Sequence, residues 1–236
     1  MAASPRRLAL LLRTASLLLL SSAVSAAEAA APDNADLASR PLSPAQIALF
    51  ETPHLQAIDH PETLRYRYER VGLDPLVDSV TLHIETIHPD GTKYVSFEFL
   101  TGEHHQFFPA VDEFKGNPLL MLFLEHDVRE MKQQFGVASA YFRDQVRSAF
   151  VDRAKMADTT IELDGKTVPA KEITLKPYEG DARFEKLPAV KDKTYSFILS
   201  DQVPGEIQQL KIDEPADPES HAPAWSETIS FAGVTP

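Results

Sequence analysis

Alternating apolar and polar residues dominate two stretches of the chain, one on each side of a central helical region. In residues 64–69, Leu64, Tyr66 and Tyr68 share one face and charged side chains share the other. This period of two is typical of a half-buried β-strand. The same alternation recurs in residues 80–87, 95–99 and 195–199, and the ranges 207–212 and 225–231 also read as strands. We therefore predict antiparallel strands in both halves of the chain.

A Pro-Asp-Gly turn at residues 89–91 joins two of these strands into a hairpin. A loop that keeps the two apolar faces together pairs Leu82 with Phe99 and Ile84 with Phe97. A slip by one residue would exchange the faces, so burial favours this register.

The period changes to that of a helix in the middle of the chain. Apolar residues recur every three or four positions from Leu120 to Phe135. Asn117-Pro118 precede this run and Gly136 follows it, as expected at the two ends of a helix. The first turns, residues 119–124, are apolar all round, which indicates that they enter a core or a groove. Ser139 caps a second helix, so we predict a helical hairpin.

The order of elements predicts an α+β fold. Ser43-Pro44 begin a short helix, and Asp164-Gly165 form the turn of a later hairpin. Strands precede and follow the helical hairpin. We expect one curved, largely antiparallel sheet, of which an unclosed barrel is one form, with the helical hairpin packed on one face.

The N-terminus has the order of charges and apolar residues that export signals have. Arg6, Arg7 and Arg13 accompany a leucine-rich stretch, and small residues end at Ala26. We expect a signal peptide over residues 1–26, a disordered leader over 27–42 and a single α+β domain over 43–236. The expected location is the periplasm, with no transmembrane segment after signal cleavage. The chain has no cysteine, which excludes a lipoprotein anchor and disulfides.

Charge removes one class of partner. The chain has a net charge of −12 and no basic cluster. Such a surface repels phosphate backbones, so we expect no nucleic-acid partner.

The sequence offers little that points to catalysis. It contains neither G-x-S-x-G nor S-x-x-K, and we assign no catalytic residue. His126 and Glu130 are one helical turn apart, but zinc needs at least three converging protein ligands. The predicted hairpin sets His83 opposite Glu98, an ordinary surface pair. We therefore expect no metal site and no cofactor.

The aromatic and apolar positions are the strongest candidates for ligand binding. Two interpretations are open: the residues form a packed core, or the curved sheet and its helices enclose an apolar cavity. The candidate ligand-binding residues are Tyr66, Tyr68, Phe97, Phe99, Leu120, Phe123, Phe197 and Trp225.

This plan resembles the periplasmic lipoprotein carrier and receptor (Lol-type) proteins. The stretch Leu64-Arg65-Tyr66-Arg67-Tyr68 is similar to the first long strand of that family. The resemblance implies an unclosed β-barrel with a helical lid over an apolar cavity. Arg65 and Arg67 are candidates, by position, for the arginine of that cavity.

The favoured hypothesis is an exported binding protein for an acylated or otherwise apolar ligand. Its expected partner is an apolar small molecule or an acyl chain. The alternative is an assembly factor that docks another envelope protein through exposed edge strands. An exported hydrolase ranks third.

Overall fold

A computed structural model of the protein describes residues 40–114, 116–218 and 221–235. The expected signal peptide and most of the expected leader lie outside these residues. The first strands are β1 (Glu62–Val71), β2 (Leu76–Ile87), β3 (Lys93–Phe99) and β4 (Val111–Phe114). The later ones are β5 (Lys155–Leu163), β6 (Lys166–Leu175), β7 (Thr194–Leu199), β8 (Ile207–Glu214) and β9 (Trp225–Thr235). The helical elements are α2 (Pro44–Gln46), η1 (Ile47–Glu51), η2 (Gly102–His104), α3 (Leu119–Phe135), α4 (Ser139–Asp152), η3 (Ala182–Phe184) and α5 (Pro188–Lys191).

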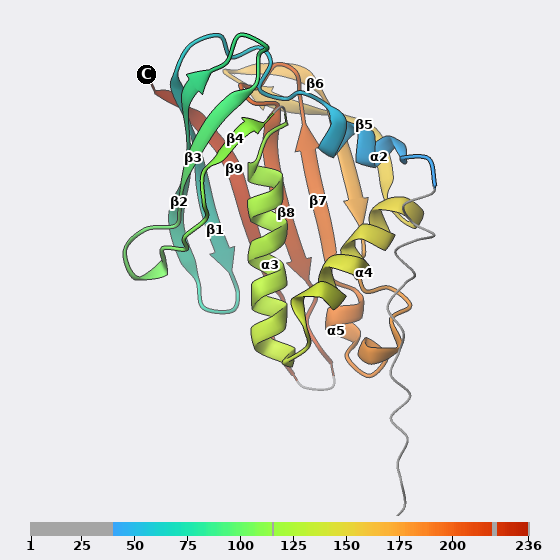
Figure 1. The fold of residues 1–236 in the computed structure, drawn as a ribbon. Helices are drawn as coiled ribbons and strands as arrows, with labels where there is room; N and C mark the ends of the chain where they lie inside the picture. The colour runs from blue at the N-terminus through green and yellow to red at the C-terminus, as the bar shows by residue number, and fades with distance from the viewer. Residues whose placement is uncertain (1–39, 115, 219–220, 236) are drawn as a thin grey trace, which may run out of the picture.

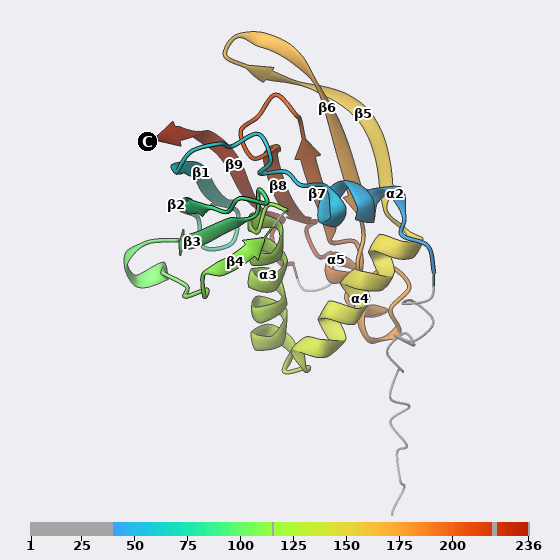
Figure 2. The ribbon, with the colours of Figure 1, turned by 45° about the horizontal axis from the view of Figure 1, so that its top comes forward.

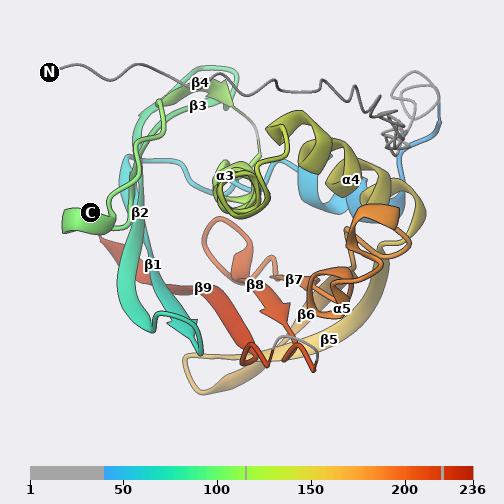
Figure 3. The ribbon, with the colours of Figure 1, turned by 90° about the horizontal axis from the view of Figure 1, so that it is seen from below.

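All nine strands form one antiparallel sheet, in the order β4-β3-β2-β1-β9-β8-β7-β6-β5. The sheet curves around α3, and its two edges, β4 and β5, are not paired with each other (Figure 1). Helices α4 and α2 lie in the gap between these edges (Figure 3). The predicted α+β class, with one curved and unclosed antiparallel sheet, is therefore confirmed. Figure 2 shows the β5–β6 hairpin reaching beyond the other strands.

The register of the β2–β3 hairpin differs from the prediction by two residues. Leu82 pairs with Phe97 and Ile84 with Val95, so the apolar faces do coincide. The predicted partners, Phe99 and Phe97, were each two positions too far along β3. A slip of two keeps every side chain on its face, so the apolar pattern alone cannot detect it. An irregularity between Ile84 and Thr86 sets the observed register. Consequently His83 lies opposite Ser96, and Glu98 lies opposite Thr81.

The ends of α3 follow the sequence closely. The cap position of α3 is Pro118, and the side chain of the preceding Asn117 accepts a hydrogen bond from the Leu119 amide at 3.0 Å. Gly136 ends it with φ 67°, the left-handed conformation that glycine adopts without strain. Helix α4 begins at Ser139, but its cap position is Ala138, so the predicted capping role of Ser139 was wrong. The Ser43 hydroxyl caps α2 as predicted, accepting from the Gln46 amide.

The same asparagine fixes α3 inside the curve of the sheet. Its side-chain amide donates to the Gly205 carbonyl at 2.8 Å, in the turn between β7 and β8. Gly205 has φ 74°, and a Cβ there would lie 2.7 Å from a Leu64 methyl carbon and 2.9 Å from the Asn117 amide nitrogen. The start of α3 is therefore held against the β7–β8 turn at a position where a side chain would be strained and would crowd both Leu64 and Asn117.

The interior between α3 and the sheet is the main hydrophobic core. Side chains from β1, β2, β3, β6, β7, β8 and β9 meet the inner face of α3 there. A smaller cluster packs the far end of α3 against α4 and the segment around Tyr178 and Phe184. Among the residues that the structure describes, no helix is both long and apolar enough to cross a membrane.

Candidate functional site

The structure gathers most of the predicted ligand-binding residues in the interior, around α3. Phe123 lies with its ring centre 6.3 Å from that of Tyr195 and 6.0 Å from that of Phe197. Phe97 and Trp225 are only partly buried, and Trp225 lines two surface pockets. The six that are at most 1% exposed are Tyr66, Tyr68, Phe99, Leu120, Phe123 and Phe197. In the conformation seen here, α3 fills the space around these six side chains.

An apolar groove opens on the opposite, outward side of α3. It has a volume of about 430 Å³ and runs between α3, α4 and the segment of α2 and η1. Met121, which is 52% exposed, lies on its α3 wall. Its apolar lining consists of Phe50, Met121, Leu124, Val128, Val146 and Phe150. The groove exists because the first turns of α3 carry apolar residues on both faces.

Polar residues rim this groove. Arg143 donates from Nε and Nη2 to the Glu125 carboxylate, at 3.0 and 2.8 Å. Arg147 and Gln46 also line the groove, and Arg147 donates to Asp144 at 2.9 Å. The groove therefore combines an apolar floor with two guanidinium groups at its edge.

A second feature, which we call the charged cluster, lies beneath the C-terminal half of α3. It comprises Arg70 on β1, His126 and Glu130 on α3, and Glu227 on β9, with the Tyr68 hydroxyl beside them. Glu227 Oε2 accepts from Tyr68 at 2.6 Å and from Arg70 Nη2 at 2.9 Å. The same Arg70 atom donates to Glu130 Oε1 at 2.5 Å. One arginine thus joins the carboxylates of two elements.

His126 completes the cluster from the helix side. Its Nε2 lies 3.1 Å from Glu227 Oε1, and both side chains are 1% exposed. Its Nδ1 lies 3.1 Å from Gln106 Oε1. Burial alone would lower the pKa of His126, but the nearby Glu227 carboxylate outweighs it and raises that pKa. Burial alone would raise the pKa of Glu227, but the charges of His126 and Arg70 and the bond from Tyr68 lower it to about 2.

The charged cluster should make the free energy of unfolding depend on pH in the acid range. Since the folded-state pKa of Glu227 lies below its ordinary value of 4.5, its stabilisation is complete above pH 4.5 and lost as pH falls towards about 2. The loss should amount to about 3 kcal/mol. Urea unfolding of the wild type and Glu227→Gln across this range measures it. The stability difference between the two proteins should shrink as pH falls; a constant difference would contradict the assignment.

A buried ion pair between Lys193 and Asp127 lies next to the charged cluster. Lys193 Nζ donates to Asp127 Oδ1 at 2.6 Å, with the two side chains 2% and 0% exposed. The Tyr195 hydroxyl donates to the other oxygen of Asp127. Lys193 Nζ also lies 3.8 Å from Glu214 and 5.1 Å from the centre of the Trp225 ring. The charges are paired, so their burial is tolerated.

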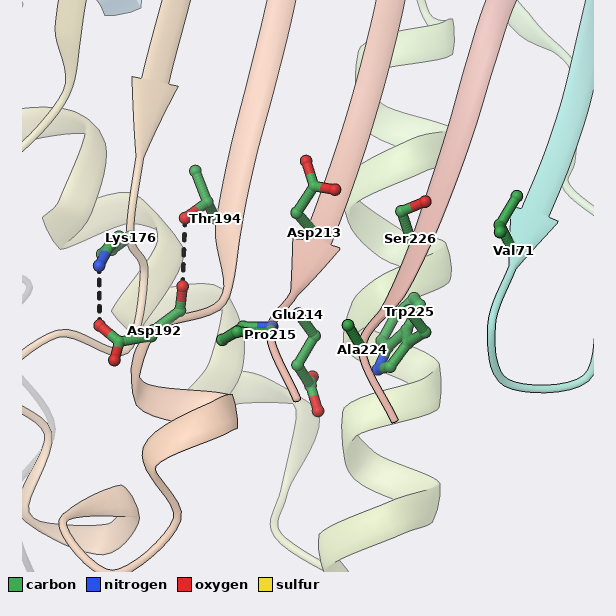
Figure 4. A pocket seen from close by; sticks show the side chains of 10 residues that line it. All are labelled: Val71, Lys176, Asp192, Thr194, Asp213, Glu214, Pro215, Ala224, Trp225 and Ser226. Atoms are coloured by element: carbon green, nitrogen blue, oxygen red, sulfur yellow. Dashed lines mark hydrogen bonds and ion pairs between the residues drawn. The ribbon is translucent and has the colours of Figure 1, made fainter. Parts of the chain in front are cut away.

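Two pockets open outside this polar layer and share Glu214, Pro215 and Trp225. The larger, of about 610 Å³, lies at the ends of β7, β8 and β9 (Figure 4). Lys176 donates to Asp192 there at 2.7 Å. The smaller, of about 470 Å³, has Arg70 and Glu130 in its wall. Two members of the charged cluster therefore face the smaller pocket, whereas His126 and Glu227 stay buried behind them.

The sequence identified part of this arrangement. His126 and Glu130 were recognised as neighbours on one helix face, and Asp127 as part of the same stretch, whereas Glu227 and Lys193 were missed. A signal for Glu227 was present: it shares the inward face of β9 with Ile229, where the alternation predicts an apolar residue. A charge at such a position indicates a buried partner.

Comparison with known proteins adds no identity. The sequence matches no protein-family model. It has no significant match among curated proteins.

Proposed function

We propose that the protein is an exported, non-catalytic binding protein for a ligand with an acyl chain, and that the chain occupies the groove between α3 and α4. The observation that carries this proposal is the apolar lining of a groove of about 430 Å³. Ligand sites of this size, with apolar walls and a few polar groups, are typical of small-molecule binding. The Lol-type resemblance suggested the same class of ligand.

The rim favours an amphiphile over a purely apolar molecule. Arg143 and Arg147 stand beside the apolar floor, where a carboxylate or phosphate head group could accept hydrogen bonds from them. Arg143 already binds Glu125, so a head group would share or replace that partner. Burial of the chain would contribute about 25 cal/mol for each Å² of apolar surface removed from water.

The groove replaces the interior as the proposed site because α3 occupies the interior. Leu120 and Phe123, which the sequence nominated, are at most 1% exposed and pack between helix and sheet. A ligand could reach them only if α3 left the sheet. The groove needs no such rearrangement.

Changing the floor of the groove should weaken the binding of a fluorescent fatty acid. Met121→Glu puts a carboxylate beside the chain at a position that is 52% exposed, so the fold should survive. We expect at least about tenfold weaker binding in a fluorescence titration. Met156→Glu is the matched control, because Met156 is 40% exposed on β5 and does not line the groove. It should bind as the wild type does.

Leu120→Trp separates the groove from the interior. In a packed interior it costs about 1–3 kcal/mol of stability and leaves the groove open. If it abolished probe binding while Met121→Glu did not, the ligand would belong inside the sheet. If the wild type showed no saturable binding, the carrier proposal would fail.

The second candidate, a factor that docks a partner protein, is favoured by one observation. β5 is an edge of the sheet, nine residues long, and most of its side chains are exposed. Long uncovered edges are the places where another chain adds a strand. A failure of the probe experiment would move this function to first place.

A further inference from the structure

Two buried atoms of the charged cluster face each other without a hydrogen bond. His126 Nε2 and Glu227 Oε1 are 3.1 Å apart, and neither has a hydrogen-bond partner among the described residues. The other polar atoms of these side chains are occupied: Gln106 lies at His126 Nδ1, and Tyr68 donates to Glu227 Oε2. Two buried acceptor atoms this close repel each other unless a positive species lies between them, and that species is either a proton on His126 or a metal ion.

Glu130 offers a third ligand at the same point. It follows His126 by one helical turn, and its Oε1 lies 3.7 Å from His126 Nε2. Ligand atoms of all three side chains lie within 4.8 Å of one another. Two ligands of one tetrahedral zinc ion lie about 3.3 Å apart, because each bond is about 2.0–2.1 Å long. We propose that His126, Glu130 and Glu227 bind one divalent transition-metal ion of the zinc class.

The surroundings have the features of an outer shell around a metal. A histidine that ligates through one nitrogen usually donates its other N–H to an oxygen, and His126 Nδ1 is placed to do so towards Gln106 Oε1. Tyr68 and Arg70 hold Glu227 Oε2, which leaves Oε1 for the ion. With a neutral His126, the cluster holds one arginine and two carboxylates, so it carries an excess negative charge for a cation to balance.

Access also fits an ion that exchanges with solvent. Glu130 is 35% exposed and, with Arg70, lines the pocket of about 470 Å³. Three protein ligands would leave the fourth position of a zinc ion open, as in sites that bind water or a substrate. The sequence-based expectation of no metal rested on counting ligands along one helix, where Glu227 cannot be seen.

The competing explanation is a proton in place of the metal. His126 would then be an imidazolium paired with Glu227, and Glu130 and Arg70 would complete a purely structural network. Because a metal must displace that proton, zinc binding at neutral pH should release protons. The carboxylates that act on His126 are Glu227 on β9 and Glu130 and Asp127 on α3. The Tyr68 ring lies 6.4 Å from the imidazole, and Arg70 binds Glu130 and Glu227.

The test is a zinc titration of untagged, chelator-stripped protein against a chromophoric chelator. We expect one Zn²⁺ per chain in the wild type, with binding at least a hundredfold weaker in His126→Ala. His105→Ala is the matched control, since His105 is exposed and outside the cluster, and it should bind as the wild type does. Glu130→Gln, at a partly exposed position that should tolerate the change, should weaken binding at least about tenfold.

Two outcomes would overturn the metal site. One is wild-type binding no tighter than that of His126→Ala when circular dichroism shows both folded. The other is stoichiometric zinc that His126→Ala and Glu130→Gln both leave unchanged. Substituting Co²⁺ gives a direct readout, because its visible absorption reports the ligand set. Met121→Glu, in the acyl groove, should leave zinc binding unchanged, so the two proposals can fail separately.

Discussion

Replacing Glu227 by alanine is expected to destabilise the metal-free protein by about 3–5 kcal/mol. The substitution takes one of two carboxylate partners from Arg70, leaves the buried His126 without the Glu227 carboxylate, and removes the acceptor of the Tyr68 hydroxyl. Removing one partner of a buried ion pair costs this much because the remaining charge stays desolvated. Urea unfolding in the presence of a chelator measures the change without any contribution from bound metal.

The control is an exposed carboxylate with a similar partner. Asp158 contacts Lys171 at 2.9 Å, but its side chain is 89% exposed. Such surface pairs contribute little, so Asp158→Asn should leave the unfolding midpoint unchanged. An equally small effect of Glu227→Ala would show that the cluster does not carry the stability assigned to it.

The buried Lys193–Asp127 ion pair should show strong energetic coupling between its two residues in a double-mutant cycle. Asp127→Ala leaves Lys193 buried without its carboxylate, and it removes the acceptor of Tyr195. We expect a loss of about 3–5 kcal/mol for Asp127→Ala and a comparable loss for Lys193→Met. The double variant should lose about 1–3 kcal/mol less than the two losses added together. Denaturant unfolding of the four proteins decides this; strictly additive losses would mean that the two charges do not depend on each other.

Local pattern predicted the elements well because each strand or helix buries one face. The alternation in β1 and the apolar spacing in α3 follow directly from that requirement. The requirement to bury one face does not determine which residues of two strands pair. The two-residue difference between the predicted and observed register of β2 and β3 shows this limit. Short β4 was missed because four residues are too few to display a period.

The site was predictable only where its residues are neighbours in sequence. His126 and Glu130 share a helix face, so their proximity follows from helix geometry. Glu227 reaches them because β9 pairs with β1, next to Tyr68 and Arg70. Local pattern does not show which distant strand pairs with which; the charge of Glu227 on the inward face of β9 signalled a buried partner but not its identity. Whether the aromatic residues line a cavity or form a packed core depends on the position of α3. The spacing of apolar residues does not reveal that position.

The central place of β9 in the sheet bears on how the chain folds. β9 is the last strand in sequence, yet it joins β1 to β8 and so connects the four strands β1–β4 with the four strands β5–β8. The two halves can each form hairpins early, but the strand that unites them is synthesised last. Such distant pairing raises the contact order, which favours folding in milliseconds to seconds rather than microseconds. A chain that stops before Trp225 has no strand to join its halves, so the complete sheet can form only once β9 is present.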